Sequence, residues 1–151
     1  MNKKTLKDLN VENKRVLVRV DFNVPIKEGI ITDTNRIDAS LTTIKYLIDN
    51  DAKVILMSHL GRPKGEPKSE FSLKPVAQKL SEMIGQNVKF VDNDKVVDDS
   101  VIEESKKLQP KEIMLIQNTR FRKEEEKNDE TFSKELSQLA DLYVNDAFGT
   151  S

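Results

Sequence analysis

The chain has 151 residues, which lies within the usual range of a single domain, roughly 100–200 residues. Charged residues make up 34% of it, but 25 Lys and Arg nearly balance 26 Asp and Glu, so nothing in the net charge calls for nucleic acid or a membrane surface as a partner. The absence of cysteine excludes disulfides and thiolate metal sites. The first residues, MNKKTLKDLNVENK, lack the apolar segment of a signal peptide, and no run approaches the roughly 18 apolar residues of a membrane span. We therefore expect one soluble, cytoplasmic domain over residues 1–151.

Short runs rich in β-branched and aliphatic residues alternate with longer segments of helical period. The runs that predict strands are residues 15–20, 53–58, 88–91, 112–116 and 142–144. After the first of them, Ile37, Leu41, Ile44 and Ile48 recur at steps of three and four and predict a helix with one apolar face that ends near Asn50.

A second helix is predicted around Val76, Leu80 and Ile84, with Ser72 as its N-cap and Gly85 ending it in a left-handed conformation. Shorter helices are predicted over residues 101–108 and 129–139. This regular alternation predicts an α/β fold: a doubly wound, Rossmann-like parallel sheet with helices on both faces.

Ligands of such sheets bind at the carboxyl ends of the strands, so the loops after Val20, Ser58, Ile116 and Val144 are the candidate site. Asp21 and Asn23 follow the first strand and offer hydrogen bonds to a polyhydroxy ligand. An Asx-type turn before Pro25 is an equally good interpretation of these two residues.

The loop after the second strand holds the single histidine, His59, next to Arg62 and two glycines that let the backbone bend close to a ligand. Arg36 opens the first long helix, and Arg120 follows the fourth strand. Each of these side chains alone is typical of a surface or structural residue. Together, from separate strand ends, they predict a crevice for a small phosphorylated acid, because guanidinium groups match carboxylate and phosphate oxygens two at a time.

Other motifs indicate no nucleotide or metal site. The segment GRPKGEPKS (61–69) fails the Walker pattern, no G-x-G-x-x-G occurs, and the Asp146 to Gly149 segment is not the Asp-Phe-Gly of protein kinases because an alanine is inserted. The acidic run at 124–126 is expected to form a solvated surface loop.

Four segments closely resemble motifs of the phosphoglycerate kinase family: RVDFNVP (19–25), SHLGRPKG (58–65), NTRF (118–121) and VNDAFGTS (144–151). They occur in order and with the expected spacing, and the resemblance covers the whole chain but only a little over a third of the family's usual length. It implies the N-terminal, substrate-binding domain of an enzyme that transfers a phosphoryl group between 1,3-bisphosphoglycerate and ADP, or between ATP and 3-phosphoglycerate in reverse.

The resemblance also implies roles for six residues. Asp21 and Asn23 would hydrogen-bond the glycerate portion. His59, Arg62 and Arg120 would contribute to the basic patch that holds the substrate. Arg36 would stabilise the moving phosphoryl group as the catalytic residue. Magnesium ATP or ADP would bind the C-terminal domain that the chain lacks, so no cofactor is expected here. The fragment is expected to be inactive alone, and full-length family members are usually monomers.

Two departures from the family stand out. The family pattern continues with a His-Arg pair beyond Ser151, so the basic patch is expected to be incomplete. Gln117 stands where many relatives carry Glu, which removes a charge that could orient neighbouring arginines. Two other hypotheses remain open: a stand-alone phosphate- or carboxylate-binding regulatory module, and an α/β domain whose arginines serve solubility only.

Overall fold

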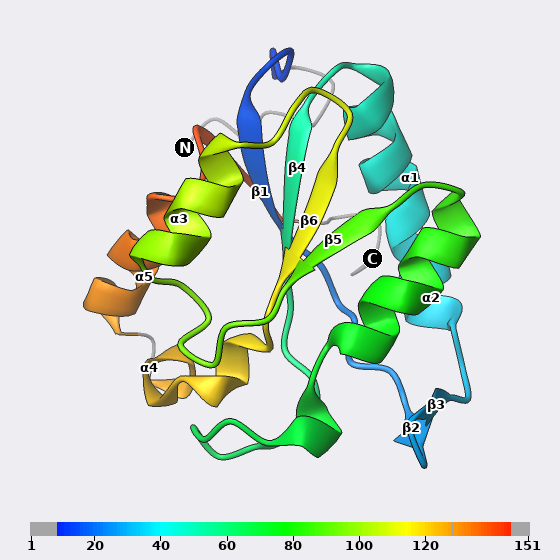
Figure 1. Ribbon diagram of the computed structural model, residues 1–151, viewed down its shortest axis with the longest axis vertical. Helices are drawn as coiled ribbons and strands as arrows, with labels where there is room; N and C mark the ends of the chain where they lie inside the picture. Colours follow the sequence, from blue (N-terminus) through cyan, green and yellow to red (C-terminus); the bar gives the residue numbers. More distant parts are fainter. Residues whose placement is uncertain (1–8, 128, 146–151) are drawn as a thin grey trace.

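The computed structural model describes residues 9–127 and 129–145, and its centre is a parallel sheet of five strands (Figure 1). The sheet order is β5-β6-β4-β1-β7, so the first strand lies in the interior. The predicted fold class is confirmed, and all five predicted strands form with ends within two residues of those expected. They are β1 (Arg15–Arg19), β4 (Lys53–Met57), β5 (Val88–Val91), β6 (Ile113–Ile116) and β7 (Leu142–Asn145).

Helices cover both faces of this sheet (Figure 1). α1 (Asn35–Asp49) and α2 (Lys74–Ile84) pack on one face, and α3 (Asp99–Lys106) and α5 (Glu130–Ser137) on the other. The chain moves toward the β5 edge through α1 and α2 and returns toward β7 through α3 and α5. Crossovers between parallel strands are right-handed. A crossover toward the β5 edge therefore places its helix on one face of the sheet, and a crossover toward β7 places its helix on the other.

Alternate residues of the strands supply two hydrophobic layers. Val16 and Val18 of β1 face α1 and α2, whereas Leu17 between them faces the α3 and α5 side. Phe132 of α5 is 2% exposed in the second layer, and burying such a side chain stabilises the fold by roughly 1.5–3 kcal/mol. The sheet is therefore fixed from both sides, which holds its carboxyl edge in place.

The helices begin and end largely where the sequence predicts. Gly85 ends α2 with φ +78°, the left-handed conformation expected of it. The predicted cap Ser72 is one residue off, because Leu73 is the N-cap of α2 and Ser72 Oγ accepts the backbone N–H of Lys74 at 3.2 Å. A short 3-10 turn, η2 (Ser69–Phe71), comes just before and ends at Ser72.

Several short elements were not predicted. β2 (Ile26–Lys27) and β3 (Ile30–Ile31) form a hairpin whose two loop residues, Glu28 and Gly29, both have positive φ. η3 (Thr119–Phe121) and α4 (Lys123–Glu126) follow β6. The hairpin and α4 lie at the same end of the sheet, at the bottom of Figure 1. None of the described helices combines the length and apolarity that crossing a membrane requires.

Candidate anion-binding site

Ser58 joins the loops that follow three neighbouring strands. Its hydroxyl accepts the backbone N–H of Phe22 at 2.9 Å, and its carbonyl accepts the backbone N–H of Thr119 at 3.0 Å. Ser58 is almost fully buried. The loops after β1, β4 and β6 are therefore parts of one hydrogen-bonded layer at the carboxyl edge.

Asn118 fastens the same layer from the β6 side. Its Oδ1 accepts the backbone N–H groups of Leu60 and Arg120 at 3.2 and 3.0 Å, and its Nδ2 donates to the carbonyls of Leu60 and Phe71 at 2.7 and 2.9 Å. The side chain is fully buried. Asn118 therefore fixes the backbone at Leu60, between His59 and Arg62, and the backbone at Arg120.

Asp21 and Asn23 form the turn that follows β1. Asp21 Oδ1 accepts the backbone N–H of Asn23 at 3.0 Å, which is the Asx-type turn considered for this segment. Asn23 Oδ1 in turn accepts the backbone N–H of Gly61 at 2.8 Å and so ties this turn to the next loop. Both side chains are partly exposed and lie at the strand mouth, so the structural interpretation holds without excluding contact with a ligand.

Arg36 lies in the first turn of α1, and its side chain reaches back to the Asx-type turn formed by Asp21 and Asn23. Its Nη1 donates to the carbonyl of Asn23 at 2.5 Å and to Asp21 Oδ1 at 3.4 Å. Its side chain remains 52% exposed. The guanidinium is thus held beside Asp21 and Asn23 by two contacts and remains about half exposed.

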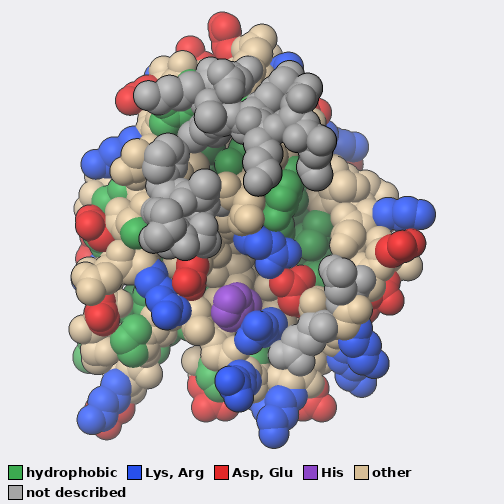
Figure 2. Space-filling model, turned by 180° about the vertical axis from the view of Figure 1, so that it is seen from behind, with side chains coloured by type: hydrophobic (Ala, Val, Ile, Leu, Met, Phe, Trp, Pro, Cys, Tyr) green, Lys and Arg blue, Asp and Glu red, His purple; other side chains and the backbone are tan. Residues whose placement is uncertain are grey.

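Charges on neighbouring segments of the chain act on His59. Burial and the Arg120 charge lower its pKa below the ordinary 6.5, while Asp21 and Glu125 oppose the shift. The imidazole is half-buried, and Figure 2 shows it open to solvent on this face with both basic and acidic side chains around it. It is therefore harder to protonate than a free imidazole, although two acidic and two basic side chains act on its charge.

Arg120 and the glycine loop lie against each other. Arg120 Nη1 donates to the carbonyl of Gly61 at 3.4 Å, and the Arg120 carbonyl accepts the N–H of Gly65 at 3.2 Å. Gly61 has φ +61°, and a Cβ there would overlap the ring of Phe71. Arg62, next to Gly61, is exposed at the rim.

The predicted convergence is thus largely present. Arg36 contacts Asp21, Arg120 contacts Gly61, and Asn23 joins their two loops through the N–H of Gly61. Asp21 and Arg120 both act on the charge of His59. β4 leads to α2 and β6 to α5, so the loops carrying His59 and Arg120 leave toward opposite faces of the sheet. Such a divergence is where open α/β sheets bind ligands.

Gln117 has a structural role that the sequence did not indicate. Its Nε2 donates to Ser72 Oγ and Asp92 Oδ1 at 3.1 and 3.0 Å, and its Oε1 accepts the backbone N–H groups of Leu73 and Asn118 at 3.0 and 2.9 Å. These contacts connect β6 to the start of α2 and to the end of β5. The neutral side chain uses both its donors and its acceptor in the buried layer, and none of these four hydrogen bonds involves an arginine side chain.

The acidic run is also not the solvated loop that was predicted. Residues 124 and 125 lie in α4, and Glu125 is only 13% exposed because it accepts a hydrogen bond from Arg19 Nη1 at 2.9 Å. Glu124 pairs instead with Arg122, whose guanidinium also bonds Glu135 and lies over the ring of Phe132. A run of like charges is normally solvated, so no signal in the sequence marked Glu125 as an internal partner.

The side chains at this carboxyl edge have the chemistry that an anion requires. They offer guanidinium groups, a neutral imidazole and carboxamide or carboxylate oxygens, which suit a small molecule with phosphate, carboxylate and hydroxyl groups. Within residues 9–127 and 129–145, no cluster of three His, Cys, Asp or Glu side chains is arranged to hold a metal ion.

Comparisons with known proteins identify the family of the chain. The family model described as phosphoglycerate kinase matches residues 6–151. The chain belongs to the phosphoglycerate kinase family. It is similar to the phosphoglycerate kinase of Finegoldia magna, with 95% identity over 151 residues, and to that of Clostridium perfringens strain 13, with 57% identity over 150 residues.

Both relatives are much longer than this chain, which covers 38% of each. Among solved structures, the phosphoglycerate kinase of Pyrococcus horikoshii OT3 matches with a TM-score of 0.82 and 36% identity, and that of Coxiella burnetii with 0.79 and 39%. Each match covers 93% of this chain and 35% or 34% of the other. The family motif at 144–151 falls outside the described residues from Asp146 onward.

Proposed function

We propose that the chain is the substrate-binding domain of a phosphoglycerate kinase and binds 3-phosphoglycerate or 1,3-bisphosphoglycerate in the crevice at the carboxyl edge. The observation that carries this proposal is that hydrogen bonds join the loops after β1, β4 and β6, which carry Asp21, His59 and Arg120, into one layer at the carboxyl edge. Family membership supplies the substrate class, and the crevice supplies groups that suit it.

In this proposal Asp21 and Asn23 accept and donate hydrogen bonds to the glycerate hydroxyl and carboxyl groups. His59, Arg62 and Arg120 hold the phosphate, for which two arginines and a neutral imidazole supply several donors. The loops that carry these groups are already bonded to one another, so little ordering is needed on binding.

Arg36 is the proposed catalytic residue. Phosphoryl transfer depends on positioning and on neutralising the charge of the moving group more than on covalent help. The exposed guanidinium of Arg36, steadied by Asp21 and the Asn23 carbonyl, is suited to bond the oxygens of that group.

The nucleotide and its magnesium ion belong, in this proposal, to the part of the family that this chain does not span. Residues 1–151 would then bind substrate without catalysing transfer. Arg36 would contribute to the reaction only where a second domain brings ATP or ADP to the crevice.

An NMR titration of the chain with 3-phosphoglycerate tests the proposal, following the backbone amides of the six proposed residues. We expect saturable shifts at these residues with 3-phosphoglycerate and none with magnesium ATP, together with no ATP-dependent turnover. Lys45→Ala, on the exposed face of α1, serves as a control that leaves binding unchanged, whereas Arg62→Ala weakens it. Silence with 3-phosphoglycerate would contradict the proposed binding, and turnover by the pure chain would contradict the proposed inactivity.

A further inference from the structure

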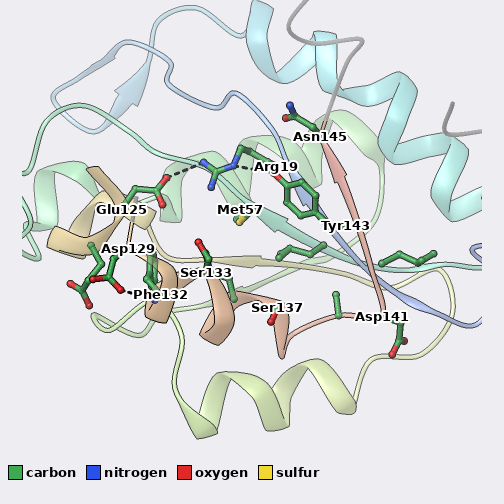
Figure 3. A pocket seen from close by; sticks show the side chains of 15 residues that line it. Arg19, Met57, Glu125, Asp129, Phe132, Ser133, Ser137, Asp141, Tyr143 and Asn145 are labelled. Atoms are coloured by element: carbon green, nitrogen blue, oxygen red, sulfur yellow. Dashed lines mark hydrogen bonds and ion pairs between the residues drawn. The ribbon is translucent and has the colours of Figure 1, made fainter. Parts of the chain in front are cut away.

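Arg19 and Glu125 form an ion pair near the proposed site. The proposed function gives this pair no role. Arg19 is the last residue of β1; its Nη1 donates to Glu125 Oε1 at 2.9 Å and its Nε lies 3.3 Å from the hydroxyl of Tyr143 (Figure 3). The Glu125 side chain is 13% exposed. The pair lies on the wall of a groove of about 780 Å³ that runs between α5 and β7.

Glu125 has a second partner in the residue before Arg120. Thr119 Oγ1 lies 3.3 Å from Glu125 Oε1 and 3.2 Å from the carbonyl of Ser58, and its one proton serves one acceptor at a time. The Ser58 carbonyl already accepts the backbone N–H of Thr119, and a bond to a carboxylate is the stronger choice. Glu125 therefore connects the end of β1 with the segment that carries Arg120.

A carboxylate in this position opposes anion binding by simple Coulomb repulsion. It lies close enough to His59 to act on the imidazole charge, as Arg19 and Arg120 also do. Any benefit of Glu125 to binding must therefore come from geometry. If repulsion dominates, removing the charge of Glu125 should lower the Kd for the substrate. If geometry dominates, removing the charge should raise the Kd, so an affinity measurement separates the two effects.

We propose that Glu125 is a positioning residue for the substrate: it holds Arg19 toward β7 and fixes Thr119, so that Arg120 stays against Gly61 and beside His59. The inference rests on the proposed function, because it assigns a role in the same site. Glu125 itself does not touch the substrate in this scheme and acts through Thr119 and Arg120.

The test is 3-phosphoglycerate affinity of Glu125→Gln, which keeps the shape of the side chain and removes its charge. We expect the Kd to rise by about fivefold or more, because an amide oxygen accepts the hydrogen bonds of Arg19 and Thr119 more weakly than a carboxylate oxygen does. The matched control is Glu124→Gln, which removes the same charge one residue away, where the carboxylate pairs with Arg122. Its Kd should change by less than about twofold.

Two further measurements separate positioning from folding. Glu125→Asp keeps the charge but shortens the reach, so it should also weaken binding. His59 gives the single histidine signal of the chain, and its pKa should fall in Glu125→Gln but not in Glu124→Gln, since Glu125 raises it. If Glu125→Gln does not fold, as judged by urea unfolding, Glu125→Asp decides the question.

Tighter or unchanged binding by either Glu125 variant would overturn the positioning role. If the unaltered chain fails to bind 3-phosphoglycerate, the proposed function fails first. If it binds and the Glu125 variants bind equally well, only the present inference is wrong.

Discussion

Asn118 makes four hydrogen bonds without exposing any of its side chain, and each bond reaches backbone of a loop that carries site residues. We expect Asn118→Asp to destabilise the fold by about 3 kcal/mol at pH 7, because a carboxylate would face the carbonyls of Leu60 and Phe71. Urea unfolding measures this. Asn87→Asp, at an exposed position, is the control and should change stability by about 0.5 kcal/mol or less.

The loss in Asn118→Asp should depend on pH. Burial beside two carbonyl oxygens raises the pKa of the new carboxyl in the folded state, so the folded state binds its proton more tightly than the unfolded state. The variant therefore loses stability relative to the parent as pH rises through that pKa. A deficit that is no smaller at pH 4 than at pH 7 would argue against a buried carboxylate at this position.

His59 should titrate below its ordinary pKa of 6.5, because it is half-buried and lies near Arg120. The unfolded chain then binds the proton more readily, so this group's contribution to stability is present above pH 6.5 and is lost as the pH falls from there toward the folded pKa. An NMR titration of the single histidine measures the shift. Arg120→Met should move the His59 pKa upward, and an unchanged value would show that Arg120 lies too far away to act.

At the scale of the element, α3 begins at a cap that carries a charge. Asp98 accepts the backbone N–H groups of Ser100 and Val101 as well as hydrogen bonds from the side chains of Ser100 and Asn93, and these bonds lower its pKa from 3.8 to about 2. Asp98→Ala should cost about 1 kcal/mol at pH 7. The loss should be constant above pH 4 and shrink as the pH falls toward 2, where the native carboxylate is protonated.

Asp98→Asn is the matched variant for α3, because an amide oxygen still caps the helix but does not titrate. It should retain most of the stability and lack the pH dependence between about 4 and 2. Thermal unfolding of both variants across this range measures the difference. Equal behaviour of the alanine and asparagine variants would exclude a capping role for Asp98.

The main elements were predictable because their burial is periodic. Ile37 and Ile44 mark the inner face of α1, and β1, β4 and β6 are apolar runs because both sheet faces are covered. The β2–β3 hairpin escaped prediction because its strands have two residues each and its turn places Glu28 at positive φ. α4 was missed because its single turn consists of charged residues, and only the ion pairs of Glu124 and Glu125 explain it.

The location of the site was predictable at the same level, since topology alone brings strand ends together. Asp21, His59 and Arg120 lie on the loops that follow β1, β4 and β6, which are neighbours in the sheet. The hydrogen bonds of Ser58, Asn118 and Gln117 were not predictable: they depend on the register of the strands, which the sequence pattern does not specify. The partner of Arg19 was also not predictable, because Glu125 lies 106 residues away along the chain.

At the scale of the whole molecule, a net charge of −1 means that attraction for an anion comes from the crevice alone. We expect the Kd for 3-phosphoglycerate to rise several-fold between 0.05 and 0.5 M NaCl, as the Debye length falls from roughly 14 to 4 Å. Calorimetric titration at several salt concentrations measures this. In Arg62→Ala the salt dependence should be shallower, and a Kd independent of salt would mean that the arginines do not neutralise the ligand.

The interior position of β1 also bears on the order in which the protein can assemble during synthesis. Its neighbour β4 leaves the ribosome soon after it, but its other neighbour, β7, is made about 125 residues later, as the Arg15–Asp141 contact illustrates. Arg19 therefore waits for both Glu125 and Tyr143 to be translated before its surroundings are complete. A nascent chain arrested before residue 113 would lack β6, so the segment that brings Arg120 to His59 would not exist, and substrate added at that stage would have no crevice to stabilise.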